Sequence, residues 1–157
     1  MIYYLDASAL VKRYVAERGS EMVTEALAEA EATATAIVSR AEVSAAFAKA
    51  VRVGSLTREE ARSCESAFAA EWVDLIRIQL TEFMVERAAR LAWEYGLRGY
   101  DAVHLATAVV WEESIGMPVR LATFDARLWR TARQVGLYPF PSDLPDLLQQ
   151  SRNTGAS

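Results

Sequence analysis

The residues of this chain best suited to chemistry are four acids, each placed where a strand is expected to end or a helix to begin: Asp6, Glu42, Asp101 and Asp125. Carboxylates that converge raise one another's pKa unless a cation lies among them. An all-oxygen cluster suits Mg²⁺ or Mn²⁺, whereas a single histidine and a single cysteine argue against a zinc site. Because such an ion can activate a water for attack on a phosphodiester, the acids predict a phosphodiester-cleaving centre.

Each acid also has a structural explanation when it is taken alone. An Asp at the start of a helix often does no more than cap it, which would account for Asp101 and Asp125. Glu42, two residues after Arg40, would be a solvated helix acid. Asp6 is harder to explain in this way, because a carboxylate directly after a buried apolar strand is costly without a partner. The shared placement of the four acids favours the functional interpretation.

The elements that must position these acids alternate between strands and helices. Alternating or apolar runs predict strands over residues 2–5, 33–38, 73–80, 119–123 and 137–140. Capping residues, helical periodicity and terminal glycines predict helices over residues 7–16, 20–31, 39–54, 57–72, 81–96, from about 100, and 125–136. The expected caps are Ser20, Ser39, Thr57 in a capping box with Glu60, Thr81 and Asp125. This order predicts an α/β domain with a mostly parallel sheet and helices on both faces. In such sheets, sites lie beyond the carboxyl ends of the strands, where the acids fall.

The composition of the chain is that of one ordinary globular domain. It has 157 residues, of which 52% are hydrophobic, and a formal net charge of −4, which argues against binding nucleic acid by bulk charge alone. The longest uncharged run, residues 102–111, is well short of the ~20 residues that span a bilayer. The lone cysteine and the absence of a secretory signal at the start predict a cytoplasmic protein with no membrane attachment. We expect the domain to cover residues 1–148 and a polar, disordered tail to cover 149–157.

Four segments together resemble the PIN domain family. Leu5-Asp6-Ala-Ser8 resembles the opening motif of that family, in which a Ser or Thr follows the Asp by two residues, and Ser39-Arg-Ala-Glu42 resembles its internal Glu segment. Tyr100-Asp101-Ala-Val-His104-Leu-Ala-Thr-Ala resembles the third acidic motif, and Leu121-Ala-Thr123-Phe-Asp125 resembles the last strand with its terminal Asp. The ordered set spans about residues 2–140. The length and the third motif are most similar to the VapC toxins of type II toxin–antitoxin pairs.

This resemblance implies a PIN-like three-layer sandwich with about five strands and the activity of a Mg²⁺- or Mn²⁺-dependent endoribonuclease. It implies that Asp6 and Asp101 contact the metal directly, that Glu42 and Asp125 complete the cluster directly or through water, and that Ser8 and Thr123 are supporting hydroxyls. It also implies a VapB-type antitoxin partner and a homodimer. Apolar and aromatic residues are expected to exceed what one small core holds and so to leave a patch for such association; examples are Tyr14, Phe47, Phe68 and Trp72.

Other polar and aromatic residues are expected to belong mainly to the scaffold. His104 lies one helical turn after Asp101, and we expect a buried, hydrogen-bonded core residue rather than a catalytic base. The four tryptophans are expected to pack in the core or at an interface. Most of the arginines are expected to be solvated, and three are candidates for contact with RNA because they lie near the acids in sequence: Arg13, Arg98 and Arg127.

Three alternatives to an RNA-cleaving enzyme remain open from the residues alone. The first is an inert PIN-like module that binds RNA or regulates, and the second is a DNA nuclease of related architecture, because carboxylates and Mg²⁺ do not distinguish the two sugars. A phosphotransfer protein with Asp6 as nucleophile ranks lowest. Ser8 stands where a haloacid dehalogenase-like enzyme has its second Asp, and the two lysines, Lys12 and Lys49, lie in expected helices.

Overall fold

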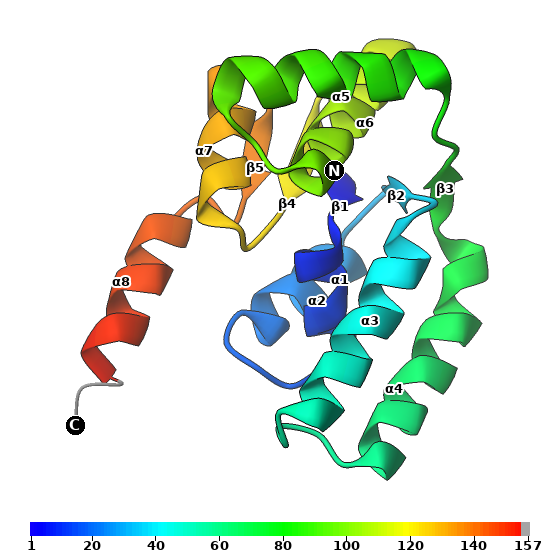
Figure 1. Ribbon diagram of the computed structural model, residues 1–157, viewed down its shortest axis with the longest axis vertical. Coiled ribbons are helices and arrows are strands. Elements are labelled where there is room, and N and C mark those ends of the chain that lie inside the picture. The colour runs from blue at the N-terminus through cyan, green and yellow to red at the C-terminus, as the bar shows by residue number, and fades with distance from the viewer. Residues whose placement is uncertain (155–157) are drawn as a thin grey trace.

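Five parallel strands form one sheet at the centre of the protein in a computed structural model, which describes residues 1–154 (Figure 1). They are β1 (Ile2–Leu5), β2 (Ala32–Ala36), β3 (Ile76–Ile78), β4 (Val119–Ala122) and β5 (Tyr138–Phe140). Their order in the sheet is β3-β2-β1-β4-β5, and every pairing in it is parallel. The four residues of β1 are all buried, because helices cover both of its faces.

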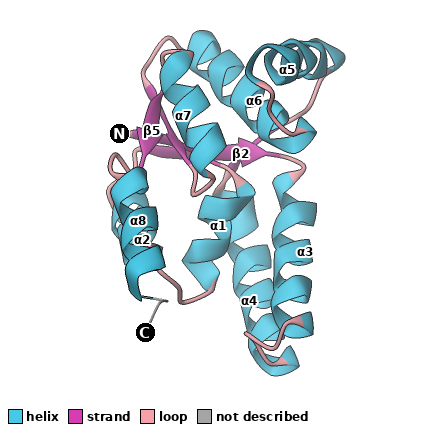
Figure 2. Cartoon of the chain, turned by 60° about the vertical axis from the view of Figure 1, so that its left-hand side comes forward, coloured by secondary structure: helices cyan, strands magenta, loops and turns pink. Residues whose placement is uncertain are grey.

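Helices lie on both sides of this sheet, as Figure 2 shows. One layer contains α5 (Glu82–Tyr95), α6 (Gly99–Ile115) and α7 (Ala126–Gln134). The other contains α1 (Ala7–Tyr14), α2 (Ser20–Ala28), α3 (Ser39–Arg52) and α4 (Arg58–Glu71), and α4 leads into a short 3₁₀ turn, Trp72–Asp74. The predicted three-layer α/β sandwich is therefore confirmed, including the number of strands.

The alternating side chains of the strands feed two separate cores. Ile2 and Tyr4 point into the core beneath α5, α6 and α7, whereas Tyr3 and Leu5 point into the core shared with α1, α3 and α4. Strand β1 is thus fixed in register by apolar contacts on both sides, so the residue that follows it, Asp6, has a defined position.

The expected capping signals hold at three helices and fail at two, because Ser20, like Ser39, is the first residue of its helix and Gly19 stands at the cap of α2. Thr57 and Glu60 form the predicted capping box of α4, Thr81 caps α5, and Asp125 caps α7 through its own carboxylate. The prediction that Ser39 caps α3 is wrong. Ser39 is the first residue of that helix, and its buried hydroxyl shares a 2.6 Å hydrogen bond with Thr35 instead.

The segment expected to form a strand over residues 73–80 is mostly not a strand. The 3₁₀ turn takes its first residues, and only Ile76–Ile78 pair with β2. Strand β3 stands at the edge of the sheet, where a single neighbour limits the length of the ladder.

The four apolar and aromatic residues expected to exceed one core contribute no exposed patch, because the sheet has a second core on its other face. Phe47, Phe68 and Trp72 are buried, half-buried Tyr14 packs against the first two, and their rings meet edge to face in the core of the α1–α4 layer. Trp93 on α5 does not pack in the core, since it is 93% exposed.

A last helix, α8 (Leu144–Thr154), follows β5 and carries the sheet-side residue Leu144, which is fully buried. The polar tail expected from residue 149 therefore begins within a helix, and its last three residues, 155–157, lie outside the described part of the chain. No helix within residues 1–154 is both long and apolar enough to cross a bilayer.

Candidate active site

The order in which strands are added to the sheet reverses between the central strand β1 and its neighbour β4. The connection after β1 leads to β2 on one side, and the connection after β4 leads to β5 on the other. This arrangement leaves an opening beyond the carboxyl ends of the two strands, which is the usual binding position in open parallel sheets. A pocket of about 270 Å³ lies there, and it is lined by Asp6, Ala7, Ser8, Glu42, Arg98, Asp101, His104, Phe124 and Asp125. All four acids singled out in the sequence thus meet in one pocket.

Asp6 is the most deeply placed of these acids, with 4% of its surface exposed. Its Oδ1 accepts hydrogen bonds from the Ser8 hydroxyl at 2.7 Å and from the Ala9 amide at 2.9 Å, and the second of these caps α1. Its Oδ2 accepts a hydrogen bond from the Thr123 hydroxyl at 2.6 Å. Burial raises the pKa of Asp6, although the charge of His104 and these hydrogen bonds act in the opposite direction.

Two hydroxyls join the end of β1 to the end of β4. Thr123, which is fully buried, donates to Asp6 and accepts from the backbone amide of Asp125 at 3.1 Å. Ser8 donates to Asp6 and accepts from the amide of Phe124 at 2.9 Å. These bonds give both residues the supporting positions expected of them.

Asp101 and Asp125 come from different helices and share one cation. Arg98 donates from Nε to Asp101 Oδ2 and from Nη2 to Asp125 Oδ2, both at 2.8 Å. The other oxygen of Asp125 accepts the amides of Arg127 and Leu128 and so begins α7. Asp101 lies in the first turn of α6, near the positive end of the helix dipole.

Glu42 reaches the pocket from α3 and is bound to His104. His104 is 2% exposed, and its Nε2 lies 2.8 Å from Glu42 Oε1, while its Nδ1 lies 2.9 Å from the Tyr4 hydroxyl. Nε2 must carry the proton of the first bond, because an ionised carboxylate can only accept. Burial by itself lowers the pKa of His104, but the hydrogen bond and charge of Glu42 and the charges of Asp6 and Asp101 outweigh it and raise the pKa overall.

His104 is therefore both a core residue and part of the site. It is the buried, hydrogen-bonded residue that was expected, and it also orients one of the four acids at the pocket wall. Its position three residues after Asp101, on the same face of α6, was the signal available in the sequence. Tyr4, which is completely buried and supports the histidine, gave no such signal.

The three arginines proposed as RNA contacts are placed differently. Arg98 lines the pocket, whereas Arg13 forms a bidentate ion pair with Glu71 of α4 at 3.2 Å. Arg127 is exposed on the first turn of α7, and its guanidinium lies over Gly96. Neither Arg13 nor Arg127 lines the pocket of the acids.

The pocket offers the oxygen donors that a hard divalent cation requires. Within residues 1–150, whose side chains the structure describes, no three acidic, histidine or cysteine side chains are spaced to enclose an ion as they stand. The cause is visible in the contacts, because Arg98 occupies Asp101 and Asp125 and His104 occupies Glu42. No lysine lines the pocket, and the cation that pairs with two of its acids is Arg98. The donor set still fits Mg²⁺ or Mn²⁺, since it consists of four carboxylates facing one space.

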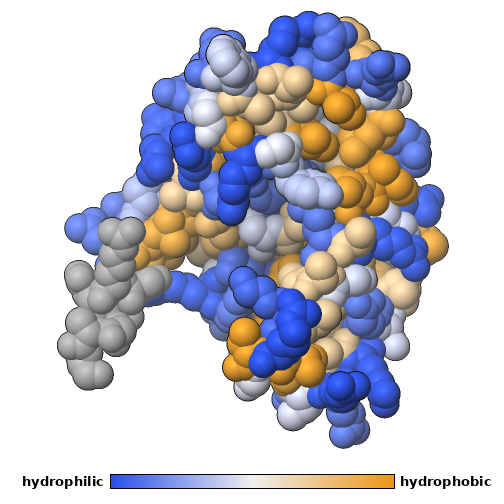
Figure 3. All heavy atoms as spheres, viewed as in Figure 1, coloured by the Kyte–Doolittle hydropathy of each residue, from blue (hydrophilic) through white to orange (hydrophobic). Residues whose placement is uncertain are grey.

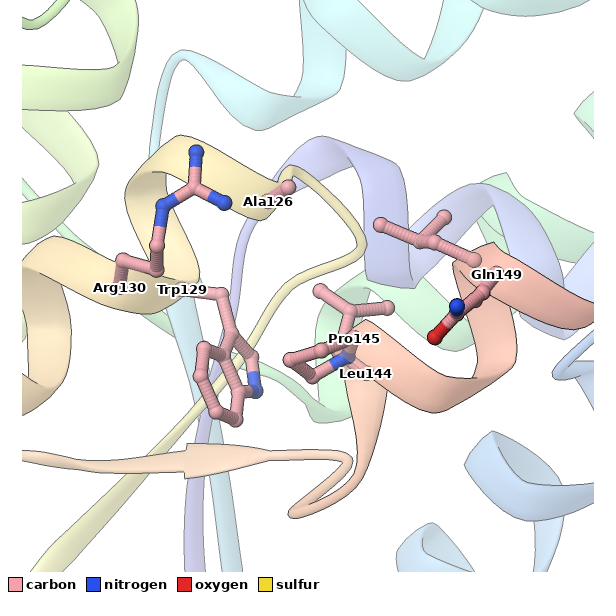
Figure 4. Close-up of a pocket in the computed structure, with 7 residues that line it drawn as sticks. Ala126, Trp129, Arg130, Leu144, Pro145 and Gln149 are labelled. Carbon is pink, nitrogen blue, oxygen red and sulfur yellow. The ribbon is translucent and has the colours of Figure 1, made fainter.

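A second hollow, between α7 and α8, has a different character. Figure 4 shows Trp129 and Arg130 of α7 facing Leu144, Pro145 and Gln149 across it. The indole of Trp129 donates to the carbonyl of Pro141 at 2.6 Å. None of the residues that line this hollow is acidic, so it offers no counterpart to the pocket beyond β1 and β4.

Comparison with known proteins agrees with the fold and the motifs. The model of the PIN domain family matches residues 3–134. The chain is 33% identical over 144 residues both to Ribonuclease VapC45 of Mycobacterium tuberculosis (strain CDC 1551 / Oshkosh) and to Ribonuclease VapC49 of M. tuberculosis (strain ATCC 25618 / H37Rv). Each alignment covers 91% of this chain and 97% of the relative.

Solved structures share the architecture at lower identity. FitAcB from Neisseria gonorrhoeae matches with a TM-score of 0.64 and 15% identity over 90% of this chain and 98% of that one. VapBC2 from Rickettsia felis, solved bound to a DNA fragment from its promoter, matches with a TM-score of 0.60 and 18% identity over 88% and 97%. The chain therefore belongs to the PIN domain family and is similar over nearly its whole length to the VapC ribonucleases within it.

Proposed function

We propose that this protein is a Mg²⁺- or Mn²⁺-dependent endoribonuclease and the toxin of a toxin–antitoxin pair. The observation that carries the proposal is the convergence of Asp6, Glu42, Asp101 and Asp125, from four separate elements, on one pocket at the carboxyl edge of the sheet. A purely structural use of these acids would explain each cap and ion pair but not their meeting at one point. The names of the two mycobacterial relatives support cleavage of RNA in particular.

The metal would be held by Asp6 and Asp101, with Glu42 and Asp125 completing the set directly or through water. Bound there, the ion would neutralise the acids and activate a water toward the scissile phosphodiester. The chain's own contribution is preorganisation, because Asp6 is fixed by three hydrogen bonds and Glu42 by His104. Residues so held need little rearrangement when substrate arrives.

We also propose an antitoxin of the VapB type and a homodimer as partners. A toxin–antitoxin complex from Klebsiella pneumoniae, which matches this chain with a TM-score of 0.58 and 20% identity over 78% of this chain and 86% of that one, supports the antitoxin. An uncovered apolar surface supports association with protein, because Figure 3 shows hydrophobic residues gathered over α5, where Trp93 is almost fully exposed. Light scattering at high concentration tests the dimer, and a monodisperse monomer would exclude it.

Four conservative substitutions test the proposed catalytic function: Asp6→Asn, Asp101→Asn, Glu42→Gln and Asp125→Asn. We expect the first two to abolish RNA cleavage and Glu42→Gln to be nearly as severe. Asp125→Asn should be the mildest, because an amide oxygen can still accept the two backbone bonds that begin α7. A matched control is Glu113→Gln, an acid at the other end of α6, about 18 Å along the helix from Asp101.

The assay compares labelled RNA with DNA of the same sequence, in Mn²⁺, in Mg²⁺ and in EDTA, with circular dichroism to verify folding. Cleavage of DNA but not RNA would show that the protein is a DNA nuclease. Absence of any cleavage, with the metal bound, would select an inert binding module. A folded Asp6→Asn protein with full activity would refute the mechanism.

A further inference from the structure

Arg98 is a cation that the chain supplies to its own acid cluster. It is the last residue before α6, and its side chain turns back to bond Asp101 in the first turn of that helix and Asp125 at the start of α7. Its guanidinium thereby joins two helices at the mouth of the pocket. The arginine side chain is 73% exposed, whereas those of Asp101 and Asp125 are 13% and 27% exposed.

Arg98 contacts one oxygen of each of two acids that would bind an incoming ion. Asp125 has committed its Oδ1 to two backbone amides, so Oδ2 is its available ligand, and Arg98 Nη2 lies 2.8 Å from it. The same guanidinium takes Oδ2 of Asp101. A divalent cation at these two oxygens competes with the guanidinium, because two positive charges beside the same oxygens repel each other.

The two ion pairs of Arg98 define one position for its guanidinium, yet they are weak enough for the side chain to leave it. The two bonds from one planar guanidinium fix its orientation, because Nε and Nη2 point to different carboxylates. The exposure of the arginine keeps the strength of each ion pair low, since solvent and salt screen it. Movement of the side chain into solvent requires no change in the backbone of α6 or α7.

We infer that Arg98 is a latch on the active site, which competes with the divalent cation for Asp101 and Asp125 and leaves when the cation binds. The inference rests on the function proposed above and adds a means of regulating that site. The displaced guanidinium remains tethered at the pocket mouth, where it can bind a phosphate of the substrate. In the closed state the acids are neutralised and the pocket cannot bind the metal through both of them.

If Arg98 is a latch, its removal should raise the affinity for the cation. A substitution that merely damaged the site would lower that affinity. Removal of a competitor raises the apparent affinity for the cation by the factor by which the closed state was favoured. For two exposed ion pairs made by one side chain, we expect about a five- to tenfold gain. The affinity of Arg98→Lys for the cation should fall between those of wild type and Arg98→Ala, because a single ammonium cannot contact both acids in the geometry of the guanidinium.

The experiment is calorimetric titration of Mn²⁺ into the metal-free full-length protein, as wild type, Arg98→Ala, Arg98→Lys and Arg127→Ala. The last is the matched control, because it removes an arginine near Asp125 whose side chain bonds neither acid. We expect Mn²⁺ to bind Arg98→Ala five- to tenfold more tightly than wild type and Arg127→Ala within about twofold of it. The gain for Arg98→Ala should shrink in high salt.

Each other result overturns the inference in a recognisable way. Equal or weaker binding by Arg98→Ala, with normal binding by wild type, leaves the metal site intact and removes the latch. An equal gain in Arg127→Ala would show a general effect of charge instead of a contact. Failure of all four proteins to bind Mn²⁺ would remove the proposed metal site, and the latch with it.

Discussion

Replacement of Thr123 by valine tests the link between the two central strands with almost no change in shape. The hydroxyl that is lost donates to Asp6 at 2.6 Å and accepts from the Asp125 amide at 3.1 Å, in a fully buried position. A hydrogen bond to a charged group contributes about 1.5–3 kcal/mol, and the added methyl returns about 0.8 kcal/mol of apolar burial. We therefore expect the free energy of unfolding to fall by about 1–2 kcal/mol and Tm by about 2–8 °C.

The assay is urea unfolding followed by circular dichroism, in EDTA so that bound metal does not contribute. The matched control is Thr131→Val, because Thr131 is also buried but its hydroxyl donates only to a carbonyl of its own helix, that of Arg127. We expect this control to remain within about 0.5 kcal/mol of wild type. If Thr123→Val is as stable as Thr131→Val, the Thr123 hydroxyl does not hold Asp6 in the way described.

The loss at Thr123 should also depend on pH, with a sign fixed by Asp6. Burial raises the pKa of Asp6 in the folded protein, and the Thr123 hydrogen bond counteracts part of that effect. A carboxyl with a raised folded pKa loses stability as pH rises through the window above its unfolded pKa. Without Thr123 that window extends further upward, so the difference between variant and wild type should be larger at pH 8 than in acid. A difference that grows in acid would contradict this sign.

Three further predictions concern the scaffold. Cys64 should need a higher pH than a free thiol to react with iodoacetamide, because burial and the charges of two neighbouring glutamates raise its pKa. Labelling as fast as in an unfolded control would contradict this. Gly96→Ala should cost about 1 kcal/mol in urea unfolding, because Gly96 ends α5 at φ +61°, whereas Gly99→Ala, in open space within α6, should not destabilise. Phe47→Ala should cost about 3–5 kcal/mol, because it empties a position that is 1% exposed, and a loss no greater than that of its exposed control Phe83→Ala would show that the core is not packed as described.

The fold and the four acids were predictable because their signals are local. The run of residues 2–5 and the Asp that follows it are adjacent in sequence, and the capping box at Thr57 lies within four residues. A short apolar run followed by an acid can be read from the sequence without knowing which strand it pairs with. Alternation with helices then implies the parallel sheet, and the parallel sheet implies that the acids share an edge.

The partners of the acids were not predictable in the same way. Arg98 and Asp125 are 27 residues apart and Glu42 and His104 are 62 apart, so only the folded chain shows that each pair is in contact. The aromatic residues of α1, α3 and α4 were misplaced for a related reason. Hydrophobicity alone does not distinguish a second core from an exposed patch, and the helical layer beneath β1 provides that core.

The pairing of β1 with β4 has a consequence for a chain as it leaves the ribosome. Asp6 and Thr123 are 117 residues apart, and the pocket needs both, together with the two acids that arrive between them. Until β4 has emerged and paired, β1 has an open edge on the side where Thr123 would stand, and Asp6 has no partner there. Asp6 is therefore synthesised early, but the pocket around it forms only near the end of synthesis. For the nuclease proposed above, this order means that the four acids form one centre only after β4 has paired with β1.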